Sequence, residues 1–118
     1  MKNDNKEYEY NAIDLLRNSQ SGTLSTISKK NQGYPFGSFT TFLTSRDRTI
    51  YFYLSDIAQH TINFKNNPKS CLTIIKHNEN GDLQNSQRIT LSGEIHKVLN
   101  EEEYYCKKKF YHFFPESK

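Results

Sequence analysis

The stretch YFYLSDIAQHTINFKNNP, residues 51–68, restricts the fold more than any other part of the sequence. It begins with aromatic residues that favour a β-strand, and this run stops at Leu54. A helical pattern follows over residues 57–66, and Pro68 prevents the helix from continuing. An apolar run at 69–77 then predicts another strand, so the chain passes from strand to short helix to strand.

Segments rich in β-branched and aromatic residues occur on both sides of this helix. We expect strands at 23–28, 36–44, 49–55, 69–77 and 87–98, with the second and third forming a hairpin. Amphipathic patterns predict further helices at 8–20 and 100–114, and residues 1–7 are expected to be disordered. This order is typical of a single α+β domain over residues 1–118, mainly β with short helices. We expect an antiparallel small barrel and not a doubly wound sheet.

The composition argues against several classes of protein. The formal net charge is only +3 and the basic residues are scattered, so we expect no nucleic-acid binding. Cys71 and Cys106 are the only cysteines and form no metal-ligand pattern, so no metal site is expected. The polar N-terminus does not resemble a signal peptide, and no apolar stretch reaches transmembrane length. We therefore expect a cytoplasmic protein without a membrane partner.

The start of the central helix is the one place where the residues themselves indicate a binding site. Common catalytic motifs are absent, and we interpret His77, His96 and His112 as ordinary surface or core residues. A helix N-terminus favours an anion, and Ser55, His60 and Thr61 add side-chain donors there. The alternative is plain capping by Ser55 and by Asp56, which fits a capping box with Gln59. From the residues alone, capping is the favoured interpretation.

Four stretches of the sequence favour a binding site over plain capping at the start of this helix. GTLSTIS, GYPFGSFTTFL, IYFYLSDIAQHTINFKNNPKSCLTI and QRITLSGEI occur in this order. Together they resemble the FMN-binding split barrels related to pyridoxamine 5'-phosphate oxidase. The stretches YPFGS, LSDIAQHTIN and NPKSCL are most similar to the haem-utilisation branch, in which YPFGS, LSxxAxHTxN and NPxxSL recur in this order. The resemblance covers residues 12 to about 115. It implies an antiparallel split β-barrel like those of FMN-binding proteins.

The resemblance also implies a phosphate site. In these proteins FMN lies at a dimer interface, with its phosphate near the end of the third strand and the following helix. His60 stands where the oxidases use a basic residue on the phosphate, and Thr61 follows it. Ser38 stands where the oxidases often place an arginine that faces the same phosphate.

Other positions are expected near the flavin ring. By the same resemblance, Tyr53, Leu54 and Ser55 would line the flavin edge, and Arg88 would approach the ring system. The alternation in 87–98 places Arg88 on the opposite side of the strand from Ile89. A surface arginine on a solvated face is an equally good interpretation of Arg88.

The sequence departs from the oxidases in three respects. Leu43 replaces a substrate-contacting lysine and Phe114 replaces an arginine, so pyridoxamine phosphate is not the expected substrate. Relatives continue with at least one more strand, and haem-degrading members carry a haem-ligating histidine in a C-terminal region. The sequence ends at Lys118, so no haem ligand is carried over from that region. We expect either that a partner subunit covers the open barrel edge or that the protein is a shortened one.

Three functions remain open. The leading hypothesis is a homodimer that binds FMN at its interface, as an FMN-dependent oxidoreductase without a visible general acid or base. The second is a haem-binding or haem-degrading protein of the same fold, for which His60, His77, His96 and His112 are the histidines available. The third is a structural relative without a cofactor. The homodimer is also expected because residues 51–53 are three consecutive aromatics, which cannot all face one core.

Overall fold

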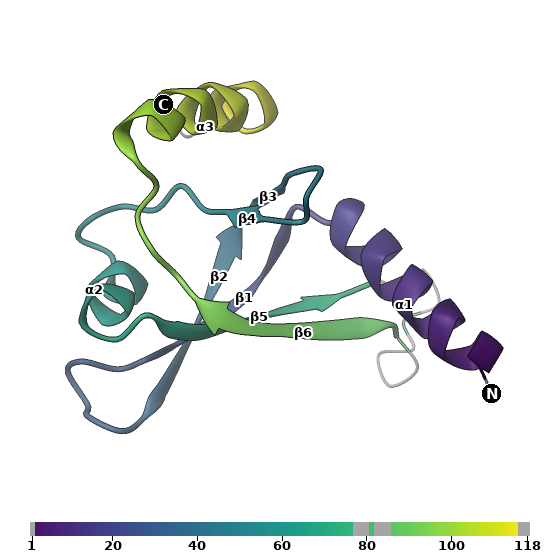
Figure 1. Cartoon of the computed structure of the whole chain (residues 1–118). Helices are drawn as coiled ribbons and strands as arrows, with labels where there is room; N and C mark the ends of the chain where they lie inside the picture. Colours follow the sequence, from purple (N-terminus) through teal and green to yellow (C-terminus); the bar gives the residue numbers. More distant parts are fainter. Residues whose placement is uncertain (1, 77–80, 82–85, 116–118) are drawn as a thin grey trace.

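The computed structural model describes residues 2–76, 81 and 86–115, and Figure 1 shows how their helices and strands are arranged. The elements in chain order are α1 (Lys2–Arg17), β1 (Ser21–Ile27), β2 (Pro35–Thr41), β3 (Leu43–Thr44), β4 (Ile50–Tyr51), α2 (Gln59–Asn66), β5 (Lys69–Ile75), β6 (Arg88–Glu94) and α3 (Asn100–Phe113). None of these helices is long and apolar enough to cross a membrane.

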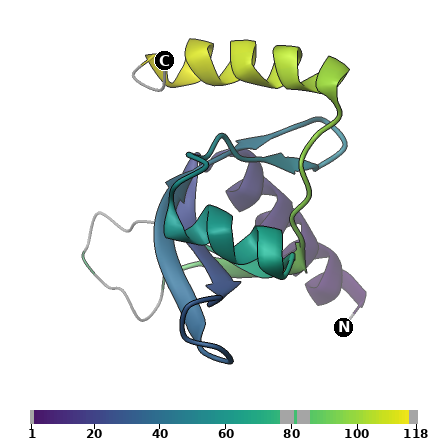
Figure 2. The ribbon, with the colours of Figure 1, turned by 90° about the vertical axis from the view of Figure 1, so that its left-hand side faces the viewer.

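The strands form an antiparallel sheet in the order β2-β1-β5-β6 and a separate short pair, β3-β4. The expected mainly β, antiparallel α+β architecture is therefore confirmed. Residues 28–34 reverse the chain between β1 and β2, and the chain passes through β3, β4 and α2 before it returns to the sheet at β5. Figure 2 shows α2 lying across the sheet, with the β3-β4 pair above it and α3 at the top.

One face of the sheet forms the core. Leu24 pairs with Leu72, and Leu72 pairs with Leu91, so these three side chains point to the same side. Phe42, which is 0% exposed, and the last turns of α1 pack against this face. Alternation of apolar and polar residues in β1, β5 and β6 is what separates this inner face from the outer one.

A buried amide fixes α2 to the inner face. The Asn63 side chain is 0% exposed, and its Nδ2 donates to Thr26 Oγ1 at 3.1 Å. Its Oδ1 accepts from the Lys29 backbone N–H at 3.0 Å and from Gln59 Nε2 at 2.9 Å. Because every polar atom of this buried amide is used, Asn63 determines where α2 lies on β1.

The outer face of the sheet carries small polar side chains and two exposed apolar ones. Phe39, Thr23, Thr73 and Thr90 lie side by side in register across the four strands. Phe39 is 75% exposed, and Ile75 on the same face is 46% exposed. In the part of the chain that the structure describes, α1 and α2 both pack on the inner face.

Several predicted boundaries are wrong. α1 begins at Lys2 and not at residue 8, although Asn3, Asp4 and Asn5 are weak helix formers. The strand expected at 49–55 ends at Tyr51. It pairs with β3, which has two residues, so the antiparallel pairing is also two residues long.

The predicted helix caps are also wrong. α2 begins at Gln59 behind Ala58, which makes no side-chain cap, so the Asp56–Gln59 capping box does not form. In α3 the N-cap is Leu99, which also makes no side-chain cap hydrogen bond. Both helices therefore begin without a side-chain cap.

Candidate functional site

The site is built where the first turn of α2 meets β2. Ser38 pairs with Leu24 across β1 and β2, so its side chain points to the inner face, where α2 lies. His60 is the second residue of α2, and its Nδ1 lies 3.0 Å from Ser38 Oγ. Two residues that the resemblance placed at one phosphate are therefore in direct contact, although they are far apart in the sequence.

The hydrogen bonds of Ser38 determine the favoured tautomer of His60. Ser38 Oγ also lies 3.4 Å from the Leu24 carbonyl oxygen, which can only accept. The hydroxyl has one proton, so both contacts are satisfied only when Ser38 donates to Leu24 and Nδ1–H of His60 donates to Ser38. In that arrangement Nε2 of His60 carries a free lone pair.

Burial favours the neutral form of the His60 ring. Burial lowers the pKa of His60 below its usual value of 6.5, because the charged imidazolium is poorly solvated there. Nε2 is buried and has no hydrogen-bond partner among the described residues. A neutral imidazole with one nitrogen held by a hydrogen bond and the other unpaired is the form that ligates metals.

Thr61 provides a second unpaired polar atom. The residue is 2% exposed, and its Oγ1 is buried with no hydrogen-bond partner in the described part of the chain. A buried polar atom without a partner costs about 1–3 kcal/mol. Two such atoms, on the adjacent residues His60 and Thr61, therefore lie together in the first turn of α2.

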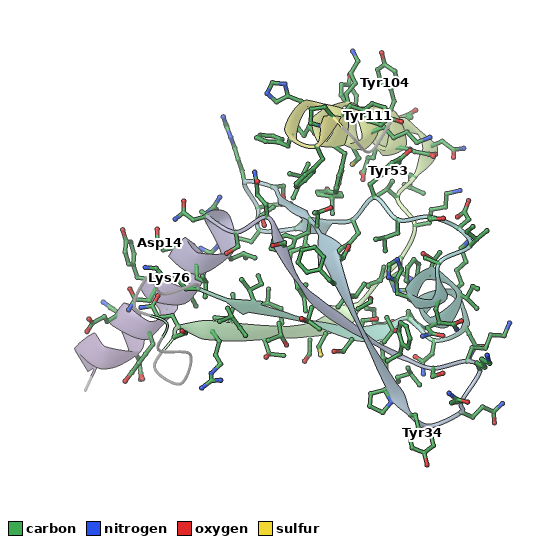
Figure 3. All side chains as sticks on the ribbon, turned by 180° about the vertical axis from the view of Figure 1, so that it is seen from behind. Asp14, Tyr34, Tyr53, Lys76, Tyr104 and Tyr111 are labelled. Carbon is green, nitrogen blue, oxygen red and sulfur yellow. The ribbon has the colours of Figure 1, made fainter. Side chains whose placement is uncertain are left out.

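The residues predicted to line the flavin edge, Tyr53, Leu54 and Ser55, lie in the segment that connects β4 to α2. Tyr53 faces α3, where its hydroxyl is 3.2 Å from that of Tyr111 and its ring centroid is 5.8 Å from that of Phe110. Figure 3 shows Tyr53 and Tyr111 close together beneath α3. Leu54 is half-buried, whereas Ser55 is exposed and its Oγ accepts from the Ile57 N–H at 3.4 Å, in a local turn. Sequence reasoning missed this contact with α3, because nothing in the sequence links positions 53 and 111.

Arg88 lies on the other side of the sheet from His60. It pairs with Ile75 at the start of β6, on the outer face, and Ile89 beside it packs against the core. The predicted alternation in this strand is therefore correct. Ser38 and His60 are on the inner face, so within one chain Arg88 does not join them in a single site.

The other candidate ligands are dispersed. His96 is exposed and lies 3.4 Å from Glu94, and His112 is exposed against the ring of Phe113. His77 lies outside the described residues. Across residues 2–76, 81 and 86–115, no group of three or more His, Cys, Asp or Glu side chains could hold a metal ion.

Two hollows of the surface lie away from the first turn of α2. One of about 340 Å³ lies between the end of α1 and β5, with Asp14 and Lys76 in its lining. Figure 3 shows these two residues close together beside α1. A smaller one of about 170 Å³ lies between the β3-β4 pair and α3. Neither contains Ser38, His60 or Thr61, so hydrogen bonding and not cavity shape identifies this site.

Comparison with known proteins identifies a family whose model matches most of this chain. The model of the CREG β-barrel matches residues 3–118. The non-canonical heme oxygenase HOZ, a chloroplastic protein of Arabidopsis thaliana, is 38% identical over 80 residues, which are 68% of this chain and 24% of HOZ. The chain thus spans about a quarter of the length of this curated relative.

Solved structures agree on the fold. The protein Atu2129 of Agrobacterium tumefaciens, of unknown function, has a TM-score of 0.83 at 21% identity, covering 95% of this chain and 47% of that one. HutZ, the heme storage protein of Vibrio cholerae, has a TM-score of 0.71 at 20% identity, covering 91% and 75%. These likenesses establish that the expected split-barrel α+β fold is correct.

Proposed function

Because this chain belongs to the CREG β-barrel family, we propose that it binds haem and that His60 is the residue that ligates the iron. The observation that supports this most is the buried, unpaired Nε2 of His60, whose other ring nitrogen is held by Ser38. Two of the relatives are described as a heme oxygenase and a heme storage protein, which favours the same cofactor.

The residues present fit an iron ligand. His60 offers a neutral imidazole, and Ser38 orients it as an outer hydrogen-bond partner. Haem, when bound, supplies the redox chemistry of its iron, and the protein's own contribution is to hold and orient the ligand. Because Nε2 is buried, haem must displace the groups that cover it, and we therefore expect binding to be accompanied by movement of the first turn of α2.

A second candidate is FMN, which the Thr61 hydroxyl favours. Thr61 Oγ1 is an unpaired donor at the N-terminus of α2, where a phosphate is stabilised by the helix dipole. In this case Nε2 of His60 must carry a proton that it donates to the phosphate, either as the other neutral tautomer, with Ser38 donating to Nδ1, or as the imidazolium, with Nδ1–H donating to Ser38. The two cofactors therefore require different protonation of Nε2 and different contributions from Thr61.

Titration of the protein with haemin and with FMN tests the proposal. Ser38→Ala removes an outer hydrogen-bond partner of the ligand and should weaken haemin binding roughly tenfold. His60→Ala removes the ligand itself and should weaken haemin binding more. Thr61→Val should leave haemin binding nearly unchanged. His96→Ala, which alters an exposed histidine, is the matched control.

Two outcomes of these titrations would contradict the haem proposal. If His60→Ala and His96→Ala bind haemin equally well, His60 is not the ligand. If Thr61→Val weakens FMN but not riboflavin, and haemin does not bind the wild type, the phosphate site is correct and the haem proposal is wrong.

We also propose that the protein is a homodimer that uses the outer face of the sheet. Phe39 and Ile75 are exposed apolar side chains there, set among small threonines over which a second flat surface can pack. In 0.5 M NaCl, which screens surface charge pairs, the wild type should sediment as a dimer of 13.9 kDa chains. Phe39→Asp should sediment as a monomer, whereas Tyr34→Asp, at an exposed aromatic in the preceding turn, should remain dimeric. A monomeric wild type would contradict this proposal.

A further inference from the structure

β6 is the outermost strand at one edge of the four-stranded sheet, where it pairs with β5 (Figure 1). Two backbone hydrogen bonds at the ends of this ladder show which residues of β6 bond to β5. The Lys76 N–H donates to the Gln87 carbonyl at 2.8 Å, and the Ile95 N–H donates to the Pro68 carbonyl at 2.9 Å. Hydrogen-bonded and non-hydrogen-bonded pairs alternate along antiparallel strands. The odd-numbered residues of β6 therefore bond to β5, and the even-numbered ones point their backbone N–H and C=O away from it.

These outward groups form an open edge. The backbone N–H and C=O of Thr90, Ser92 and Glu94 find no hydrogen-bond partner in the described part of the chain, and all three residues are exposed. The pairing with β5 is continuous, so no bulge turns the edge away. β6 also lacks the proline that protects β2 at the opposite edge, which begins at Pro35. A long edge without such protection is a template for another strand.

We propose that β6 pairs antiparallel with β6 of a second copy, with the two-fold axis at Leu91. Each strand has seven residues, so full overlap places the first residue of one strand opposite the last residue of the other. Thr90 then exchanges both of its backbone hydrogen bonds with Ser92 of the second copy, and Ser92 does the same with Thr90. The two sheets thereby become one continuous sheet.

The side chains fit this register. On the outer face, Arg88 lies opposite Glu94 of the second copy at both ends of the pairing, as opposite charges across two strands prefer. On the inner face, Leu91 lies opposite the second copy's Leu91. Ile89 lies opposite Gly93, where a Cβ would meet nothing within 4 Å, so there is room for the larger side chain. The edge is thus complementary to itself, as two-fold symmetry requires.

Contacts within one chain do not pair these two charges with each other. Arg88 and Glu94 are six residues apart on an extended strand, which separates them by about 20 Å. Glu94 lies opposite Lys69 on β5 and 3.4 Å from His96, and its side chain is 56% exposed. Exposed pairs of this kind contribute at most about 1 kcal/mol, so they leave Glu94 able to face a second copy. A register shifted by two residues would lose both the Arg88–Glu94 pairs and a part of the hydrogen bonds.

One pair of strands is a small interface, so the association should be weak. A stable interface buries roughly 1,200–2,000 Å² in total, more than a single strand pair provides. We therefore expect association through β6 only at protein concentrations of about 0.1 mM and above, and in low salt. The Phe39→Asp variant, which lacks the proposed sheet-face dimer, should be monomeric when dilute or in 0.5 M NaCl. It should associate through β6 when it is concentrated in 50 mM NaCl.

Charge reversal in the Phe39→Asp background tests the register by sedimentation equilibrium in 50 mM NaCl. Arg88→Glu and Glu94→Arg each place like charges opposite one another at both ends, and each should weaken self-association roughly tenfold. The double variant Arg88→Glu/Glu94→Arg should associate as well as its parent, because opposite charges face each other again. Lys29→Glu, which changes the charge by the same amount in an exposed turn, is the control.

A proline at the edge tests the backbone pairing independently of charge. Thr90→Pro removes an outward N–H and leaves the bonds to β5 in place, so this variant should stay monomeric when it is concentrated. In the parent, the amide resonances of Thr90 and Ser92 should shift between dilute and concentrated protein. Those of Ile89 and Leu91, which already bond to β5, should shift less. Thermal unfolding of each variant shows whether the fold persists.

Recovery in the double variant supports the pairing, because two positions about 20 Å apart in one chain cannot repair each other. A parent that stays monomeric at high concentration would overturn the proposal and leave the edge to a strand of a different protein. Single charge variants or a Thr90→Pro variant that associate like the parent would also overturn it, as would a folded double variant that does not recover. The sheet face is already disabled in this background and no cofactor is added, so these results do not depend on the sheet-face dimer or on haem.

Discussion

Replacing Phe42 by alanine is expected to lower the free energy of unfolding by about 4 kcal/mol. The side chain is 0% exposed, its ring centroid lies 6.4 Å from that of Phe52, and it packs against both α1 and β5. Removing it leaves a cavity at the point where these elements meet, and close-packed surroundings fill such a cavity only partly.

Urea unfolding checks this expectation. The transition midpoint should fall with little change in the dependence on urea, because the folded state keeps its compactness. Tyr34→Ala, at an aromatic side chain that is 70% exposed, should change the free energy of unfolding by less than about 0.5 kcal/mol. Equal effects of the two substitutions would mean that Phe42 is not at the centre of the core.

The substitution Asn63→Ala should cost about 3 kcal/mol, although it removes a polar side chain. The Thr26 hydroxyl and the Lys29 N–H would each lose a partner in a place that water reaches poorly. Because these bonds hold α2 on the sheet, the variant should also bind haemin more weakly. Asn66→Ala, on the exposed side of the same helix, is the control and should change neither property. If Asn63→Ala is as stable as the wild type, α2 is held by other contacts.

Hydrophobic alternation and the resemblance predicted most of the sheet. The alternating residues of 87–98 correctly predicted that Ile89 and Arg88 lie on opposite faces of the strand, because the period of a strand is two and one face is buried. β5 (Lys69–Ile75) lies within the predicted run 69–77 and pairs on both of its sides. Local signals were less reliable at the ends of elements. Ser55 and Asp56 have the chemistry of helix caps, yet α2 begins three residues after Asp56.

Part of the candidate site could be predicted, and part could not. The resemblance named Ser38, His60 and Thr61, but only the fold shows that the first two are in contact. Asn63 was missed, although a polar residue between two apolar ones in an amphipathic helix is a usable signal for a buried hydrogen-bonding group. The contact of Tyr53 with α3 depends on how distant segments pack, and no local pattern contains that information.

The absorption spectrum of the ferric haem complex tests the ligation by His60 most directly. The wild type should show the Soret band of a histidine-ligated haem. His60→Ala should show the band of a haem without that ligand, and added imidazole should restore the wild-type spectrum by occupying the place of the missing ring. The exposed-histidine variant His96→Ala should be indistinguishable from the wild type. A His60→Ala complex with an unchanged Soret band, with or without imidazole, would contradict the assignment of His60 as the ligand.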